Sequence, residues 1–267
     1  MLGIGLVLFA GVRVGQTLLG RLAPRLAAVE TPTDTAVSPQ VAAIVDRDVP
    51  LARGLTPEER HRLLGLTARF VREKRFEGCA GLTVTEEMRT VVGAQACLLI
   101  LHITGYFYPR LSQILVYPSA FIPRAATWVK GAAPRRPPHA VLGESWPDGT
   151  VVLAWDSAQT GGRDPADGSN VVLHEFAHQL DQEDGRSDGV PPLDTPGARR
   201  RWEAVLTAHL ARLREDLEVG RDTVLDPYGA ENAAEFFAVA TECFFERGGA
   251  LREAHPELYD LLRRYYG

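Results

Sequence analysis

Cysteine is scarce in this sequence, with Cys79, Cys97 and Cys243 as its three examples among 267 residues. Their number is odd, they are widely spaced, and they form no CxxC pair. These features argue against a disulfide framework and against a metal site built from thiolates. A reducing compartment fits this usage best, and we expect a cytoplasmic protein.

The sequence also lacks an excess of basic residues. Lysine and arginine number 29 against 34 aspartates and glutamates, so the net charge is -5. This balance offers no general basic surface for a phosphate backbone, and we expect no direct contact with nucleic acid. Hydrophobic residues make up 45% of the chain and charged residues 24%, which is typical of a folded globular protein and not of a disordered one.

Apolar runs of the roughly 20 residues that a membrane-spanning helix needs are missing as well. The N-terminal run MLGIGLVLFAGV stops at Arg13 and lacks the charged start of a signal peptide. Residues 1–23 continue with aliphatic side chains and arginine, a pattern that also fits an interfacial amphipathic helix. We expect a loosely attached helix here, with a peripheral or single-pass membrane anchor and an export signal as the alternatives.

Prolines separated by threonine and serine predict a linker over residues 24–40, and the compact domain is expected over 41–267. Thr56, Pro57 and Glu59 have the spacing of a capping box and predict a helix that begins there. Periodicity and turn residues predict further helices at 88–104, 169–182, 197–218, 231–246 and 256–266, and strands at 82–87, 114–118 and 151–156. This mixture predicts an α+β domain, helix-rich with a small sheet.

His174, Glu175 and His178 form an HExxH motif within the segment NVVLHEFAHQLD. Residues four apart on an α-helix are about 40° apart around the axis and about 6 Å apart along it, so both imidazoles can reach one ion. The residues around this motif are mostly apolar, which indicates a helix packed against the protein. They argue against the alternative, a surface helix that happens to carry two solvated histidines. Two histidines without a nearby cysteine indicate a catalytic metal site, because such sites keep one position for water.

A third ligand must come from another part of the chain. The helix expected at 231–246 carries an acidic stripe made of Glu231, Glu235, Glu242 and Glu246. Such a stripe is also typical of a solvated helix face. Glu235 and Glu242 are about 10.5 Å apart along the axis, so only one of them can be a ligand. His209 and His255 remain alternatives.

Beyond the metal motif, the chain resembles the Mlc titration factor A family of bacterial zinc metallopeptidases from about Val41 to its end. The segments RFVREKRFEG, AQACLLIL, VYPSAF, GESWPDGTVVLAWD, VVLHEFAHQLD with DGRSDGVP, and DPYGAENAAEFFAV occur in that family's order. The resemblance implies a zincin-like fold and zinc ligands at His174, His178 and Glu235. It also implies Glu175 as the catalytic base and Tyr228 as an active-site phenol, and it leaves Glu242 outside the ligand set. The family is associated with aminopeptidase-like activity and with binding of the glucose repressor Mlc.

The residue types also suggest a mechanism. Zinc lowers the pKa of water and polarises a carbonyl, while Glu175 accepts the proton of the water and delivers it to the leaving amine. Tyr228 suits donation to the developing oxyanion, although a tyrosine after Asp-Pro can also simply pack the turn. Asp181 either orients a ligand or ends its helix. The strand at 151–156, as a sheet edge, would let an extended peptide add to it.

We therefore predict a hydrolase, a zinc-dependent and aminopeptidase-like peptidase, whose substrates are peptides. The alternative belongs to a different class. It is a regulatory binding protein that sequesters a transcriptional repressor of the Mlc type, with peptidase activity secondary. Membrane contact, if it occurs, is expected through residues 1–23.

Overall fold

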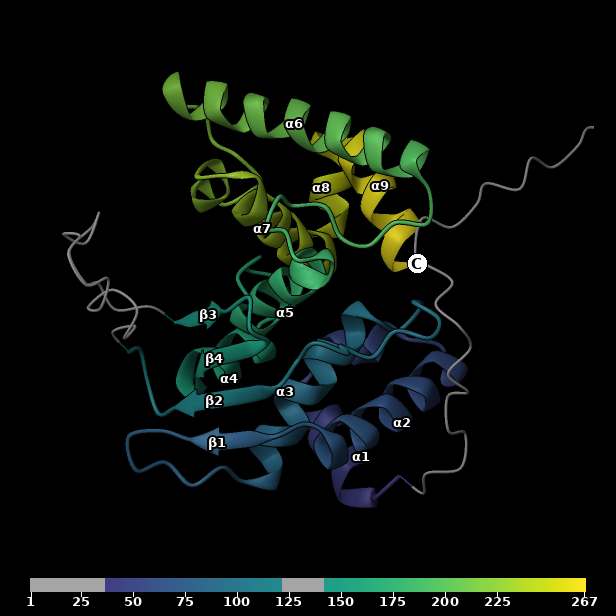
Figure 1. The fold of residues 1–267 in the computed structure, drawn as a ribbon, viewed down its shortest axis with the longest axis vertical. Helices are drawn as coiled ribbons and strands as arrows, with labels where there is room; N and C mark the ends of the chain where they lie inside the picture. Colours follow the sequence, from purple (N-terminus) through teal and green to yellow (C-terminus); the bar gives the residue numbers. More distant parts are fainter. Residues whose placement is uncertain (1–36, 122–141) are drawn as a thin grey trace, which may run out of the picture.

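The computed structural model describes residues 37–121 and 142–267, where helices surround one small sheet (Figure 1). The α-helices are α1 (Pro39–Asp48), α2 (Pro57–Glu73), α3 (Glu86–Leu99), α4 (Trp155–Arg163), α5 (Val171–Asp181), α6 (Pro196–Glu218), α7 (Ala233–Glu246), α8 (Gly248–Ala254) and α9 (Pro256–Tyr266). Short 3-10 helices are η1 (Pro50–Gly54), η3 (Gln182–Asp184) and η4 (Pro227–Ala230). The strands are β1 (Phe76–Gly78), β2 (Gln113–Tyr117), β3 (Gly143–Ser145) and β4 (Thr150–Ala154). The predicted α+β class is confirmed.

The predicted leader, residues 1–23, lies outside the described residues, as does most of the predicted linker, residues 24–40. The described chain enters α1 through Ser38, whose side chain accepts the backbone N–H of Gln40. This helix begins two residues before Val41, where we place the start of the domain. Within residues 37–121 and 142–267, no helix has both the length and the apolar character needed to cross a membrane.

The first helices show why some predictions hold and one does not. The capping box of α2 is present, because the Thr56 hydroxyl accepts the N–H of Glu59 and the Glu59 carboxylate accepts the N–H of Thr56. The apolar helix α3 is buried from Thr90 to its end. The strand expected at 82–87 is wrong. Thr85 caps α3, and the acidic residues after it form the first helical turn. The alternation of apolar and polar residues over 82–87 therefore does not come from a strand.

The described strands form a sheet in the order β1-β2-β4-β3, with β3 antiparallel to β4 and the other neighbours parallel. The edge position expected for residues 151–156 is wrong, because β3 pairs along the outer side of β4 and is itself the edge strand. The strand also ends at Ala154, since Trp155 begins α4. The sheet face that carries Gly143 and its partner Leu153 packs against α5.

The C-terminal half supplies the helices on the other side of α5. Figure 1 shows α6 lying across α7, α8 and α9, with α5 between this group and the sheet. The four helices predicted at 169–182, 197–218, 231–246 and 256–266 are confirmed as α5, α6, α7 and α9. Trp202 of α6 is fully buried against the rings of Phe237 and Tyr265, so this group shares one apolar core. Helix α5 is thereby held from two sides.

Candidate metal centre

The amino end of α5 is fixed by carboxylates of α7. Asn170 caps α5, and its side-chain oxygen accepts the N–H groups of Val172 and Leu173, each at 3.1 Å. The backbone N–H of Asn170 donates to Glu242 at 2.5 Å, and its side-chain amide donates to Glu246 at 3.0 Å. Together with the packing of α5 against α7, these bonds hold the two helices in the register in which an acidic residue of α7 meets the HExxH motif.

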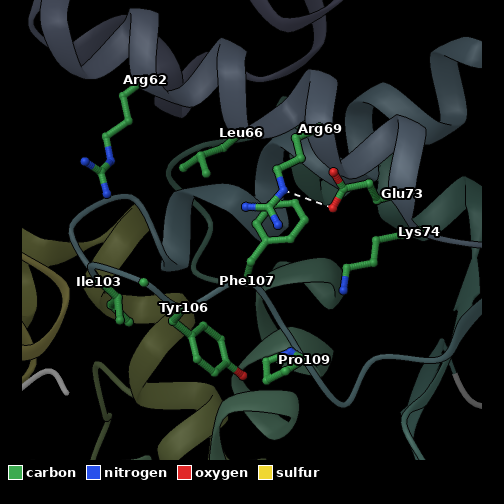
Figure 2. Close-up of a pocket in the computed structure, with 10 residues that line it drawn as sticks. Arg62, Leu66, Arg69, Glu73, Lys74, Ile103, Tyr106, Phe107 and Pro109 are labelled. Atoms are coloured by element: carbon green, nitrogen blue, oxygen red, sulfur yellow. Dashed lines mark hydrogen bonds and ion pairs between the residues drawn. The ribbon is translucent and has the colours of Figure 1, made fainter. Parts of the chain in front are cut away.

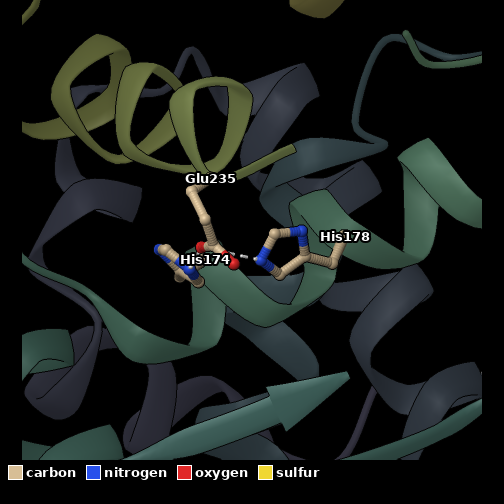
Figure 3. Close-up of side chains that lie close together, drawn as sticks. All are labelled: His174, His178 and Glu235. Atoms are coloured by element: carbon tan, nitrogen blue, oxygen red, sulfur yellow. Dashed lines mark hydrogen bonds and ion pairs between the residues drawn. The ribbon is translucent and has the colours of Figure 1, made fainter. Parts of the chain in front are cut away.

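Three side chains of these two helices converge on one point (Figure 3). The Oε2 atom of Glu235 lies 3.0 Å from Nε2 of His174 and 3.3 Å from Nε2 of His178. One ligand atom from each of the three residues lies within 4.8 Å of the other two. Two atoms that are each about 2.0–2.1 Å from a tetrahedral zinc ion are roughly 3.3 Å apart, so this donor set fits such an ion.

Glu242 contacts the other side of the first histidine. Its Oε1 lies 2.7 Å from Nδ1 of His174, while Nε2 of the same ring faces Glu235. A carboxylate that accepts the Nδ1–H of a histidine fixes the ring and leaves the Nε2 lone pair for a metal ion. Of the four acids predicted to share one stripe, Glu231 lies before α7, which begins at Ala233. Glu235 joins the histidine pair, and Glu242 contacts the opposite side of the His174 ring.

The electrostatics of this cluster favour a cation. Burial opposes the charged form of His174, but hydrogen bonds to Glu235 and Glu242 outweigh it and raise its pKa well above the usual value. Burial also opposes ionisation of Glu235, yet its bonds to His174 and His178 lower its pKa to about 2. The carboxylates therefore dominate this cluster, and positive charge between them is stabilised.

Glu175 lies beside these residues and next to the edge strand. It is 5% exposed, and burial together with the charges of Glu235 and Glu242 raises its pKa to about 8. A side-chain carbon added at Gly143 would lie 2.5 Å from Oε1 of Glu175 and 2.7 Å from a methyl group of Val171. The absence of a side chain at Gly143 thus allows β3 to approach the carboxylate.

A cavity of about 320 Å³ opens at this point, and His174, Glu175 and Tyr228 are among its walls. Asp226 caps η4, and its side chain accepts the backbone N–H of Tyr228 at 2.7 Å. The Tyr228 ring centre lies 6.0 Å from that of His174, and 50% of the residue is exposed. Tyr228 thus lies in the wall of the same cavity as the HExxH motif.

The other histidines and the aspartate that the sequence offered for the metal site do not belong to this group. His209 and His255 face each other, with their Nδ1 atoms 3.1 Å apart, and do not belong to the group around Glu235. The Asp181 carboxylate accepts the backbone N–H of Val190 at 2.8 Å and so anchors the loop after α5. Sequence reasoning missed Gly143 because a three-residue strand with little apolar character gives no alternating pattern.

Comparison with known proteins agrees with this geometry. Residues 26–267 match the sequence profile of a family described as glucose-regulated metallo-peptidase M90. The chain belongs to this M90 family. The match spans all of the described residues, including both helices of the metal centre, and it confirms the resemblance inferred from the sequence motifs.

Individual relatives are similar to this chain over most of their length. An uncharacterized protein of Synechocystis is 42% identical over 229 residues, which are 85% of this chain and 83% of the relative. Mlc titration factor A of Serratia proteamaculans is 30% identical over 223 residues, covering 82% of this chain and 83% of the relative. Mlc titration factor A of Yersinia pestis is 31% identical over 225 residues, covering 82% and 81%. This M90 protein therefore belongs to a metallopeptidase family and carries a residue group suited to a metal ion.

Proposed function

We propose that this protein is a zinc-dependent peptidase, with His174, His178 and Glu235 as the metal ligands. The supporting observation is the convergence of two imidazole nitrogens and one carboxylate oxygen within 4.8 Å, at a cavity that Glu175 also lines. Three protein ligands leave a position open, as catalytic zinc sites do, and the motif helix beside a sheet edge supports a zincin-like arrangement. A zinc ion bound there would lower the pKa of water towards 7 and polarise the substrate carbonyl.

Glu175 serves as the general base in this proposal. Its carboxylate accepts a proton from the attacking water and delivers it to the nitrogen of the leaving amine. The raised pKa of Glu175 reflects burial among carboxylates, and a cation held by the neighbouring histidines brings that pKa down. The Tyr228 phenol, in the wall of the same cavity, donates a hydrogen bond to the carbonyl oxygen as negative charge develops there.

The edge strand β3 offers a surface for a peptide substrate. Leu142 accepts the N–H of Ala154, and Trp146 donates to the carbonyl of Thr150, so the pairing groups of Leu142 and Trp146 face β4. Because these groups alternate along an antiparallel strand, the N–H and C=O of Gly143 face outward. An extended peptide that pairs with Gly143 runs past Glu175, which lies against the same residue.

An aminopeptidase-like preference is supported by the charge of the cavity. Among its lining residues the charged side chains besides His174 are the carboxylates Glu175, Asp226 and Glu242. Negative charge near the scissile bond stabilises the protonated amino group of a short peptide. We therefore expect faster cleavage of aminoacyl and dipeptide substrates than of the same compounds with an acetylated amino group.

The decisive experiment replaces the proposed base without touching the metal ligands. Glu175→Gln should retain zinc by elemental analysis while hydrolysis of chromogenic aminoacyl substrates falls by at least about 100-fold. Glu215→Gln, at an exposed position on α6, is the matched control and should keep both zinc and activity. Unchanged hydrolysis by zinc-loaded Glu175→Gln would contradict the mechanism.

A regulatory binding function is the second candidate, because two of the relatives carry the name Mlc titration factor A. In this proposal the protein sequesters a repressor of the Mlc type in the cytoplasm, a location consistent with its three free cysteines. A purified repressor of this type should bind wild type and Glu175→Gln equally in a calorimetric titration. Binding without detectable hydrolysis by the wild type would make this the main function, and absence of binding would remove it.

A further inference from the structure

A second cavity, of about 280 Å³, lies between α2 and the segment that follows α3 (Figure 2). Its walls include Arg62, Arg69 and Lys74 from α2 and its end, and Ile103 and Phe107 from the opposite segment. It shares no lining residue with the cavity at the metal centre. Any ligand of this cavity would therefore contact side chains that the proposed peptidase reaction does not use.

The charge of this cavity is opposite to that of the chain. Arg62, Arg69 and Lys74 bring three positive charges and Glu73 brings one negative charge, which leaves a formal charge of +2. The whole chain carries a net charge of -5. Figure 2 shows the ends of the three basic side chains directed into the space between α2 and the opposite segment. A concave site with this local charge attracts anions.

Two of the cations are held in place by contacts that leave donors free. Arg69 pairs with Glu73 at 2.9 Å and lies over the Phe107 ring, with its central carbon 3.9 Å from the ring centre. The Lys74 ammonium donates to the carbonyl oxygen of Tyr108 at 2.6 Å, which accounts for one of its three hydrogens. Burial lowers the pKa of Lys74, so an incoming negative charge would stabilise its protonated form.

Arg62 has hydrogen-bonding capacity that the described residues do not use. Its Nε atom is buried without a hydrogen-bond partner, and no ion pair of Arg62 occurs in residues 37–121 and 142–267. A buried donor without a partner lowers the stability of the protein, and a suitably placed acceptor recovers that loss. The fork of a guanidinium matches the oxygens of phosphate and carboxylate groups.

The remaining wall is apolar. Leu66, Ile103 and the ring of Phe107 face the same space as the basic side chains. We propose that this cavity is a binding site for a small organic anion. Its phosphate or carboxylate group contacts Arg62, while Arg69 and Lys74 add to the positive charge of the cavity. Its organic part packs against Leu66, Ile103 and Phe107.

Calorimetric titrations of the zinc-loaded protein test this site at constant ionic strength, with phenyl phosphate, benzoate and inorganic phosphate as probes. At least one of the two aromatic anions should bind, and more tightly than inorganic phosphate, because only they can use the apolar wall. The tighter of the two aromatic probes identifies the preferred anionic group.

Variants locate the binding. Arg62→Gln should weaken binding of the aromatic anion by about tenfold or more, since a charge-assisted hydrogen bond is lost. Arg200→Gln, an exposed position on α6 with the same change of charge, should bind like the wild type. Glu235→Gln should also bind like the wild type, which separates this cavity from direct coordination to the zinc ion. Equal affinities of wild type and Arg62→Gln, loss of binding in Glu235→Gln, or no heat with either aromatic anion at millimolar concentration would each overturn the proposal.

Discussion

Glu242 and His174 are joined by a contact of 2.7 Å between Oε1 and Nδ1, on the side of the imidazole ring that faces away from Glu235. One helix thus supplies both the proposed metal ligand and the group that orients its neighbouring ligand. Two glutamates of the same helix therefore contact opposite nitrogens of one histidine, and we assign them different roles.

Metal content should reveal this division. We expect one zinc ion per chain, lost from His174→Ala, His178→Ala and Glu235→Ala because each removes one donor of the group. Glu242→Ala should still bind zinc, with an affinity about 10–100-fold lower, since the orienting partner of His174 is gone. Competition with a chelator measures both effects.

The control for this series is Glu246→Ala. Glu246 accepts hydrogen bonds from Asn170 and Gly168, whereas the carboxylates that contact His174 are those of Glu235 and Glu242, so zinc affinity should remain near that of the wild type. Retention of zinc by Glu235→Ala together with its complete loss from Glu242→Ala would reverse the assignment.

Gly143→Ala should impair hydrolysis without removing the metal. The added methyl group would overlap the Glu175 carboxylate at 2.5 Å, so either β3 or the proposed base must move. A misplacement of about 1 Å at a reacting group costs up to about 100-fold, and we expect kcat/KM to fall at least about tenfold. Gly65→Ala, in α2 with nothing within 4 Å of the added carbon, should keep full activity. Full activity of Gly143→Ala would show that this close approach is unimportant.

Deletion of residues 1–36 should leave a folded, zinc-loaded and active protein, because every described contact of α1 is retained. Deletion of residues 1–40 removes Ser38 and Pro39, and with them the cap of α1, and should lower the free energy of unfolding by about 1 kcal/mol relative to the shorter deletion. Thermal unfolding and zinc analysis of both proteins check this. Aggregation of the shorter deletion, or failure to hold zinc, would assign residues 1–36 to the folded core.

His255, which contacts His209 of α6, should make the free energy of unfolding fall at acidic pH. Burial, the nearby His209 and Arg212 lower the pKa of His255 to about 4, whereas an unfolded chain has a histidine pKa near 6.5. The unfolded state therefore takes up this proton first as pH falls. The resulting loss of stability begins below about pH 6.5, amounts to about 2 kcal/mol by pH 5, and is complete below about pH 4.

His255→Gln, which cannot be protonated in this range, isolates that contribution. Its melting temperature should fall less than that of the wild type between pH 7 and pH 5, when both are compared with their own values at pH 7. Parallel curves would show that His255 is readily protonated in the folded protein.

The sequence predicts the helices of the site well because their signals are local. Capping residues and apolar spacing locate α2, α5 and α7, and the HExxH spacing places His174 and His178 on one side of α5. The choice between Glu235 and Glu242 is not local. Both lie on one stripe, and the packing of α5 against α7, to which the bonds of Asn170 contribute, decides which of them meets the histidines.

The position of β3 at the edge of the sheet could not be predicted from local sequence signals either. Strand β3 has three residues, and its position depends on pairing with β4 and on support from α5. Ser145 accepts a hydrogen bond from the Gln179 amide at 2.7 Å, a contact between residues 34 positions apart. Tertiary contacts of this kind, and not alternation along the strand, make these residues the edge of the sheet.

The distance along the chain between the two halves of the metal centre also affects when the centre can form during synthesis. Glu235 follows His174 by 61 residues. At translation rates of roughly 5–20 residues per second, the third donor leaves the ribosome about 3–12 s after the histidines. A nascent chain, or one cut before α7, carries the motif helix without its third donor and without the partners of Asn170. Synthesis through α7 is thus a condition for assembling the proposed centre, because a shorter chain cannot bring a third donor to the two histidines.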